Sequence, residues 1–378
     1  MTIDTSNWDK VTLGDIAQSL TIATKNPLSD GFERYVGLEH IEPGNIHIKS
    51  WGNVADGTTF TRVFRKGQVL FGKRRAYQKK AAMAEFDGIC SGDILVCEAI
   101  KGVVLPELLP FIVQSDRFFE HAIKTSAGSL SPRTKFKDLA KFTFKLPAKS
   151  ADQKRIADLL WSIDQVEREY SNLIKNLETL IASYMNSVLE SKKLSKARIC
   201  EIAKVTAGNS APQGDKYFNG DKKFVRVQHI LSNEVYVSKC DFVNDLAVRE
   251  CRLKLFPAKT ILFPKSGASV YLEKKAMLKE SSYVVSHLCA VMVNEEKVMP
   301  EYLLYIFKGS RLSKNCAGGY PTIDLNGVKN WEVPLPSMQE QAVIVQRINL
   351  LEGLRDKIVI QLKSSTEIKK QIINQIFG

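Results

Sequence analysis

The sequence repeats itself once, and this duplication constrains the fold more than any other feature. Residues 13–17 recur as residues 199–203, and residues 35–41 recur as residues 224–230. Further matches follow in the same order, at an offset of about 190 residues throughout. Residues 64–73 match 256–265, residues 105–109 match 299–303, and residues 127–129 match 317–319. Finally, Leu146-Pro147 matches Leu335-Pro336, and Asp152-Gln153 matches Glu340-Gln341. A duplicated chain places two copies of one structural unit, and with them two copies of any site.

Each half begins with a globular segment of mixed α/β character. Short runs rich in β-branched or aromatic residues, at 67–71, 142–146 and 283–293, are separated by Gly, Pro and Asn-Gly and are typical of strands. Residues 105–123 and 299–312 have the pattern of short helices. We therefore expect two similar mixed α/β (α+β) domains.

Each half ends in roughly 40 residues with the pattern of a long helix. The first of these stretches contains no Gly or Pro, and the second has only Gly353 in its interior. Apolar residues recur at spacings of four and three, which is the period of a coiled-coil seam. They are Ile156, Leu160, Ile163, Tyr170, Ile174, Leu177, Ile181, Tyr184 and Val188 in the first helix, and Ile344, Ile348, Leu351, Ile358, Leu362, Ile372 and Ile376 in the second. The alternative is one amphipathic helix packed on a domain core, but a helix of about 60 Å would overrun such a domain.

The chain is therefore predicted to alternate between globular domains and helices. We place a first domain at residues 1–150, a central spacer helix at 151–192, a second domain at 193–338 and a distal spacer helix at 339–378. The two apolar stripes bury each other most simply in an intramolecular antiparallel coiled coil. This arrangement relates the two domains by an approximate half-turn, which suits the pseudo-two-fold symmetry of duplex DNA. Because the copies differ in most surface residues, two unlike half-sites with an unread gap are expected.

The charge of the chain indicates a polyanionic partner. Lys and Arg number 54 against 41 acidic residues, a formal net charge of +13, and nucleic acid is the commonest partner of such chains. The seven cysteines are scattered and form no CxxC pair, which fits a reducing cytoplasm and argues against a disulfide framework or a zinc site. The sequence has no signal-like start and no run of about 18 apolar residues. Secretion and a membrane span are therefore not expected.

Candidate DNA contacts of the first domain follow a predicted strand. They are Lys73, Arg74, Arg75, Tyr77, Lys79 and Lys80. This mixture of cations with an aromatic ring suits phosphate contacts and base-edge readout, and Arg74 or Arg75 is the candidate for a guanine because a guanidinium donates two parallel hydrogen bonds. The equivalent loop of the second domain, with Lys265 and Ser266, is less charged and should read a different sequence. A solvated surface loop is the alternative.

Two glycine-bearing loops provide further candidates, because glycine lets backbone N–H groups approach a phosphate closely. Residues 125–135 contain Ser129, Arg133 and Lys135, and residues 318–322 contain Tyr320 and Thr322. An ordinary tight turn explains these loops almost as well. Arg226 and Gln228 complete the candidates at a predicted strand end, where they are placed to face a groove.

Motifs of catalysis are absent from the sequence. It contains no GxxxxGK[ST], no GxGxxG after a strand, no HExxH and no GxSxG. His40 and His229 are predicted to satisfy local hydrogen bonds, because no Cys, His or carboxylate recurs at metal-ligand spacing. Catalysis is therefore expected in other chains.

With these features in place, the chain resembles the specificity subunits of type I restriction-modification systems. The resemblance covers essentially the whole chain and is carried by the two Leu-Pro motifs with Asp152-Gln153 and Glu340-Gln341, the two helices and residues 317–325. The first copy departs from the family pattern at Asp152, where Glu is usual, and at Ser131-Pro132, which interrupts its loop.

The resemblance implies two target-recognition domains that bind double-stranded DNA, and docking of two methyltransferase (modification) subunits together with restriction/translocase subunits. It also implies no cofactor in this chain, with S-adenosylmethionine, ATP and Mg²⁺ on the partner subunits. Two alternatives remain open. One is a stand-alone architectural DNA-binding clamp with little sequence preference, and the other is an unrecognised nuclease or methyltransferase site in one domain.

Overall fold

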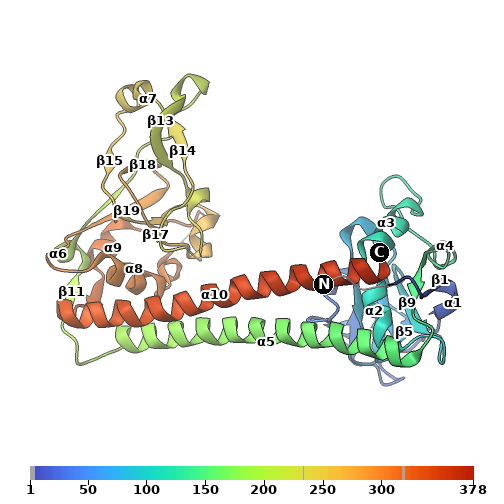
Figure 1. Ribbon diagram of the computed structural model, residues 1–378. Helices are drawn as coiled ribbons and strands as arrows, with labels where there is room; N and C mark the ends of the chain where they lie inside the picture. The colour runs from blue at the N-terminus through green and yellow to red at the C-terminus, as the bar shows by residue number, and fades with distance from the viewer. Residues whose placement is uncertain (1–4, 233, 317–319) are drawn as a thin grey trace. The chain divides into compact units, whose positions relative to one another are not determined.

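The duplication reappears as two sets of sheets in the computed structural model, which describes residues 5–232, 234–316 and 320–378 (Figure 1). The chain divides into two compact units. The first unit is Met1–Asn172 with Val359–Gly378, and the second is Leu173–Ile358. Each long helix is thus divided between the two units. Within the described ranges, no helix combines the length and apolarity that crossing a membrane requires.

The first domain contains two four-stranded sheets and a two-stranded one. The first sheet has the order β2-β9-β6-β7 and is antiparallel throughout. The second has the order β4-β3-β8-β5, with β3 parallel to β8. The strands are β1 (Asp9–Thr12), β2 (Ala17–Leu20), β3 (Arg34–Val36), β4 (Gly52–Asn53), β5 (Arg62–Phe64), β6 (Val69–Gly72), β7 (Ala81–Met83), β8 (Gly88–Cys90), β9 (Ile94–Ala99) and β10 (Thr143–Leu146), which pairs with β1.

The second domain repeats this topology strand for strand. Its sheets have the orders β12-β19-β16-β17 and β14-β13-β18-β15, with β13 parallel to β18, and β11 pairs with β20. The strands are β11 (Lys196–Arg198), β12 (Ala203–Ala207), β13 (Phe218–Val225), β14 (Asp241–Val243), β15 (Leu255–Phe256), β16 (Ile261–Pro264), β17 (Ala276–Met277), β18 (Ser282–Val284), β19 (Leu288–Val293) and β20 (Glu332–Pro334). Two similar mixed α/β domains, as predicted from the duplication, are confirmed.

The helices complete each unit. The short ones are α1 (Leu13–Ile16), α2 (Leu109–Ile112), α3 (Asp116–Lys124) and α4 (Phe136–Leu139) in the first domain, and α6 (Ile199–Ile202), α7 (Asp245–Glu250), α8 (Pro300–Lys308) and α9 (Leu325–Asn330) in the second. Phe118 and Phe119 of α3 pack on Phe71 of β6. Phe307 of α8 packs on Phe263 of β16 in the same way. Aromatic packing between helix and sheet therefore forms the centre of each core.

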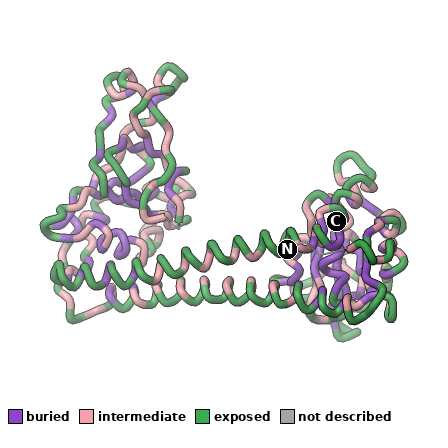
Figure 2. The backbone as a smooth tube through the Cα atoms, viewed as in Figure 1, coloured by how far each residue is buried: buried purple, intermediate pink, exposed green. Residues whose placement is uncertain are grey.

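The long helices α5 (Ser150–Leu189) and α10 (Met338–Phe377) are mostly exposed, with half-buried residues at regular intervals (Figure 2). In the first unit, Leu160 near the start of α5 shares a cluster with Ile376 near the end of α10. In the second unit, Val188 near the end of α5 shares a cluster with Ile348 near the start of α10. The predicted antiparallel direction is therefore confirmed within each unit.

The predicted seam residues lie along the less exposed side of each long helix. The terminal ones, Ile156, Leu160, Ile344 and Ile348, are buried in the domain cores. The central ones are half-buried, and they are Ile163, Ile174, Leu177, Ile181, Leu351, Ile358 and Leu362. Residues spaced three or four apart lie on one face of an α-helix, so the spacing in the sequence is enough to explain this placement.

A buried glutamine near the start of each long helix explains the motif that the two halves share. Gln153 is 3% exposed, its Oε1 accepts from Leu105 N at 2.9 Å, and its Nε2 donates to Pro147 O at 3.0 Å. Gln341 accepts from Met299 N at 2.8 Å and donates to Pro336 O at 2.9 Å. The amide therefore binds both the segment before the helix and the loop that opens α2 or α8, which fixes the direction in which the helix leaves the domain.

The apolar stripe of the first unit is interrupted by a buried charge network. Lys369 of α10 pairs with Glu167 and Asp164 of α5, and Asp164 Oδ2 lies 2.5 Å from Nε2 of His47. Nδ1 of the same ring lies 2.6 Å from Glu85. The hydrogen bond with Asp164 raises the pKa of His47, and that with Glu85 adds to the effect, against the opposing influence of burial. The network joins the first domain to both long helices.

Candidate nucleic-acid interface

The candidate loops that sequence analysis identified separately lie together in each domain. Single antiparallel bridges connect Arg74 to Arg133 and Ser266 to Thr322. The first loop pair is therefore residues 73–80 with 125–135, and the second loop pair is residues 265–271 with 320–323. In each domain, the bridge brings together the loop after an inner strand of a sheet, β6 or β16, and a segment far along the chain.

Three backbone hydrogen bonds connect Lys73 and Arg75 of the first loop pair to neighbouring segments. Lys73 N donates to Asp93 O at 3.0 Å, and Thr134 N donates to Lys73 O at 3.0 Å. Arg75 N donates to Pro132 O at 2.7 Å.

The second loop pair has the same three hydrogen bonds. Lys265 N donates to His287 O at 2.9 Å, Ile323 N to Lys265 O at 2.8 Å, and Gly267 N to Pro321 O at 2.9 Å. These bonds establish which positions are equivalent. Lys73 corresponds to Lys265, Arg74 to Ser266, Arg75 to Gly267, Asp93 to His287, and Arg133 to Thr322. One backbone frame thus presents two different sets of side chains.

Asp93 organises the side chains of the first loop pair. Its carboxylate accepts from Nε and Nη2 of Arg133 at 2.8 and 3.3 Å. Nη1 of Arg74 lies 3.4 Å away, and Nη2 of Arg74 donates to Ser131 Oγ at 3.1 Å. The hydrogen bond from Arg133 holds the pKa of Asp93 below its usual range.

The first loop pair keeps a positive charge after this pairing. Lys73, Arg74 and Arg133 all interact with the carboxylate of Asp93. Burial lowers the pKa of Lys73, and the nearby charges of Arg62 and Arg133 lower it further, with Asp93 opposing them. Cations held this close together repel one another, and a phosphate group would relieve the repulsion.

Hydroxyl groups replace the guanidinium groups in the second loop pair. Ser266 Oγ lies 2.7 Å from Nδ1 of His287, and Tyr320 is 61% exposed. Gly318 and Gly319 of the predicted loop lie outside the described residues. The second loop pair is thus less charged than the first and offers groups that both donate and accept hydrogen bonds.

Several other candidates are held by the protein itself. Lys79 Nζ lies 2.6 Å from Asp116, and this contact lowers the pKa of Asp116 to about 2, with Asn374 and Lys370 contributing. Lys80 Nζ donates to Leu38 O at 2.6 Å. These lysines are committed to internal partners.

The remaining candidates divide between exposed and paired positions. Tyr77, Ser129 and Lys135 are exposed at the first loop pair. Arg226 pairs with Asp241 at 2.6 Å and lies over Phe224, while Gln228 belongs to the short helical turn Val227–His229. Arg226 is therefore held inside the second domain.

Sequence analysis missed three residues at the loop pairs. Asp93 and His287 occupy equivalent turns, between β8 and β9 and between β18 and β19. Leu130, at the tip of the first loop pair, is 89% exposed. A lone Asp or His in a turn carries little signal, and only a match between the two turns would have indicated that they are equivalent.

The histidines named from the sequence accept local hydrogen bonds. Nδ1 of His40 accepts from Gly37 N at 2.9 Å, and Nδ1 of His229 accepts from Arg226 N at 3.0 Å. Within the described ranges, no three His, Cys, Asp or Glu side chains are grouped to hold a metal ion.

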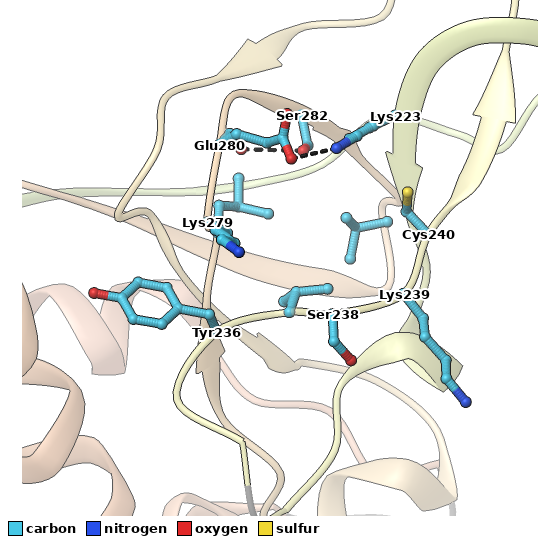
Figure 3. Close-up of a pocket in the computed structure, with 11 residues that line it drawn as sticks. Lys223, Tyr236, Ser238, Lys239, Cys240, Lys279, Glu280 and Ser282 are labelled. Carbon is cyan, nitrogen blue, oxygen red and sulfur yellow. Dashed lines mark hydrogen bonds and ion pairs between the residues drawn. The ribbon is translucent and has the colours of Figure 1, made fainter.

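A basic hollow of about 430 Å³ lies in the second domain, outside the loop pair (Figure 3). Lys223, Lys239, Lys279 and Glu280 are among its lining residues. Lys223 pairs with Glu280, so their charges cancel. Lys239 and Lys279 are exposed and add positive charge to this surface.

Comparison with protein families gives one result for both halves. The model of the type I restriction modification DNA specificity domain matches twice, over residues 5–179 and 192–376. The chain is 24% identical over 345 residues to the type I restriction enzyme MjaIX specificity subunit of Methanocaldococcus jannaschii, which is 82% of this chain and 76% of that protein. It is 24% identical over 218 residues to the EcoDI specificity subunit of Escherichia coli, 54% of this chain and 47% of that one.

Solved structures share the fold over the full length of the chain. A chain from a study of complex assembly and conformational transition in the type I R-M system has a TM-score of 0.65 at 17% identity, with 98% of each chain covered. The S subunit of the type I restriction-modification system from M. genitalium has a TM-score of 0.58 at 14% identity, with 100% and 98% covered.

Proposed function

Because the chain belongs to the family of type I restriction-modification specificity subunits, the non-catalytic subunits that recognise the DNA sequence, we propose that it binds a bipartite, asymmetric target. Each domain reads one half-site. The observation that carries this proposal is the shared backbone frame of the two loop pairs, with guanidinium groups in one and hydroxyl groups in the other.

The proposed mechanism divides affinity from specificity. Lys and Arg side chains around the loop pairs neutralise phosphates, which supplies affinity for DNA of any sequence. Side chains at the centre of each loop pair reach the base edges and supply the preference. Recognition of this kind needs no catalytic side chain in the chain itself. In type I systems, cofactor binding belongs to the partner subunits. S-adenosylmethionine is proposed to bind the methyltransferase subunits, and ATP and Mg²⁺ the restriction subunits.

The long helices are proposed to set the half-site spacing and to dock the methyltransferase subunits. Apolar residues outside the seam support docking. Leu159 and Val166 of α5 are 37% and 40% exposed in the first unit, and Leu173 and Leu180 are 47% and 51% exposed in the second. Each pair is seven residues apart, which is the spacing that a partner helix would pack against.

Selection from random DNA tests the bipartite target. The chain would be co-expressed with the methyltransferase encoded beside it, and the complex used to select bound fragments. We expect two short unlike motifs at one fixed spacing. Unselected DNA with no methyltransferase retained would contradict the proposal and favour the stand-alone architectural clamp.

Substitutions in the first loop pair refine this test. Arg74→Ala should relax the preference at one half-site by about 1–3 kcal/mol and leave the other unchanged. Arg65→Ala is the matched control, because Arg65 forms an exposed pair with Asp87 outside the loop pairs. An equal loss on all sequences would mean that Arg74 contacts only phosphate.

Docking is tested on two adjacent residues of α5. Leu173→Asp replaces an exposed side chain and should abolish co-purification of the methyltransferase without unfolding the chain. Ile174→Asp replaces a half-buried seam residue and should disturb the helix itself. Retention of the methyltransferase by Leu173→Asp would remove this surface from the docking site.

A further inference from the structure

The first loop pair contains three arginines, and their side chains are held to different degrees. Both terminal nitrogens of Arg74 face protein groups, with Nη1 3.4 Å from Asp93 and Nη2 3.1 Å from Ser131. Arg75 makes one long hydrogen bond, from Nη2 to Ser131 at 3.5 Å. Both terminal nitrogens of Arg74 therefore already have a protein partner, and Arg75 is poorly fixed.

Arg133 combines a fixed guanidinium with an unused edge. Its Nε and Nη2 donate to the two oxygens of Asp93, which occupies the side edge of the guanidinium. Among the described residues, Nη1 of Arg133 has no hydrogen-bond acceptor, and its side chain is 48% exposed. The terminal edge, formed by Nη1 and the second N–H of Nη2, is therefore accessible from solvent.

This terminal edge has the geometry that guanine requires. Two parallel N–H donors match N7 and O6 of guanine in the major groove. An arginine already held by a carboxylate loses less rotational freedom on binding than one that is free in solution.

We propose that Asp93 is a positioning residue that holds Arg133 so that its terminal edge reads a guanine in the half-site of the first domain. This inference rests on the proposed function and adds Arg133 to Arg74 as a side chain of the first loop pair that reads the half-site. The second domain has Thr322 at the position of Arg133 and His287 at the position of Asp93, so it lacks this device. His287 instead holds the hydroxyl of Ser266.

The variants Asp93→Asn and Arg133→Lys separate positioning from charge. Asparagine has the size of aspartate but cannot accept the paired hydrogen bonds of a guanidinium as a carboxylate does. Lysine keeps the positive charge of Arg133 but lacks two parallel donors. Asp87→Asn is the matched control, because Asp87 accepts from the exposed Arg65 at 2.8 Å in the same domain.

The measurement is selection from random DNA by the full chain in complex with its methyltransferase. We expect Asp93→Asn and Arg133→Lys each to lower the preference for guanine at one position of one half-site by about 5- to 100-fold. The other half-site should not change, and Asp87→Asn should behave as the wild type. A merely structural role of Asp93 would weaken binding to both half-sites or alter their spacing.

A double variant tests whether Asp93 acts through Arg133. In the Arg133→Lys background, Asp93→Asn should have no further effect on the guanine preference. An additional loss of similar size would overturn the proposal, as would an unchanged preference in either single variant. A wild-type complex that selects two motifs without guanine in one of them would also overturn it. Selection of no motif by the wild type would refute the proposed function itself.

Discussion

Replacing Gln153 by leucine should destabilise the first unit by about 3 kcal/mol. Gln153 is 3% exposed, and its amide bonds Leu105 N, Val103 O and Pro147 O. Leaving a buried backbone group without a partner costs about 1–3 kcal/mol. Three losses of about 1.5 kcal/mol each, less about 1.5 kcal/mol returned by the buried leucine, give this magnitude.

Urea unfolding of the full chain, followed together with amide hydrogen exchange at Leu105, measures this effect. We expect a lower unfolding midpoint and faster exchange of the Leu105 N–H, since that group loses its acceptor. Gln165→Leu on the same helix is the control, because Gln165 is exposed and bonds only Glu169; its effect should stay within about 0.5 kcal/mol. An unchanged midpoint together with unchanged exchange at Leu105 would refute the role assigned to Gln153.

Three further predictions concern the helix joints of the two units. The hydrogen bond with Asp164 is the main cause of the raised pKa of His47. Protonated His47 therefore stabilises the fold fully below about pH 6.5, and this contribution is lost as the pH rises through the raised pKa. The urea midpoint of the wild type should fall over this pH range, and that of His47→Gln should stay flat. Lys369→Met removes the cation that Asp164 and Glu167 share, which leaves Glu167 beside Asp164, and should cost about 3–5 kcal/mol. Glu167→Met in the same chain should restore part of this loss. Gln341→Leu should destabilise the second unit as Gln153→Leu does the first, and equal midpoints for variant and wild type would show that the two glutamines are not equivalent.

Some features of the candidate site followed from the sequence because they depend on residue type and local order. The equivalent loops after β6 and β16 were located by the repeat alone. The lower charge of the second loop was evident from Ser266 in place of Arg74. The partners of Lys79 and Arg226 were not predicted, because Asp116 and Asp241 are distant in sequence and reach these side chains only when the domain is folded.

The repeat and its helical periodicity by themselves determined the two similar domains, the two long helices and the residues that face the seam, because these depend on spacing along one segment. The tertiary structure decided which distant residues meet. Glu167 interrupts the apolar stripe, and the sequence offers no reason for it until Lys369 is found beside it. Asp93 is one carboxylate among many until the strand order brings its turn against Arg74 and Arg133. Side-chain pairing across a sheet depends on topology and register, which local sequence patterns do not encode.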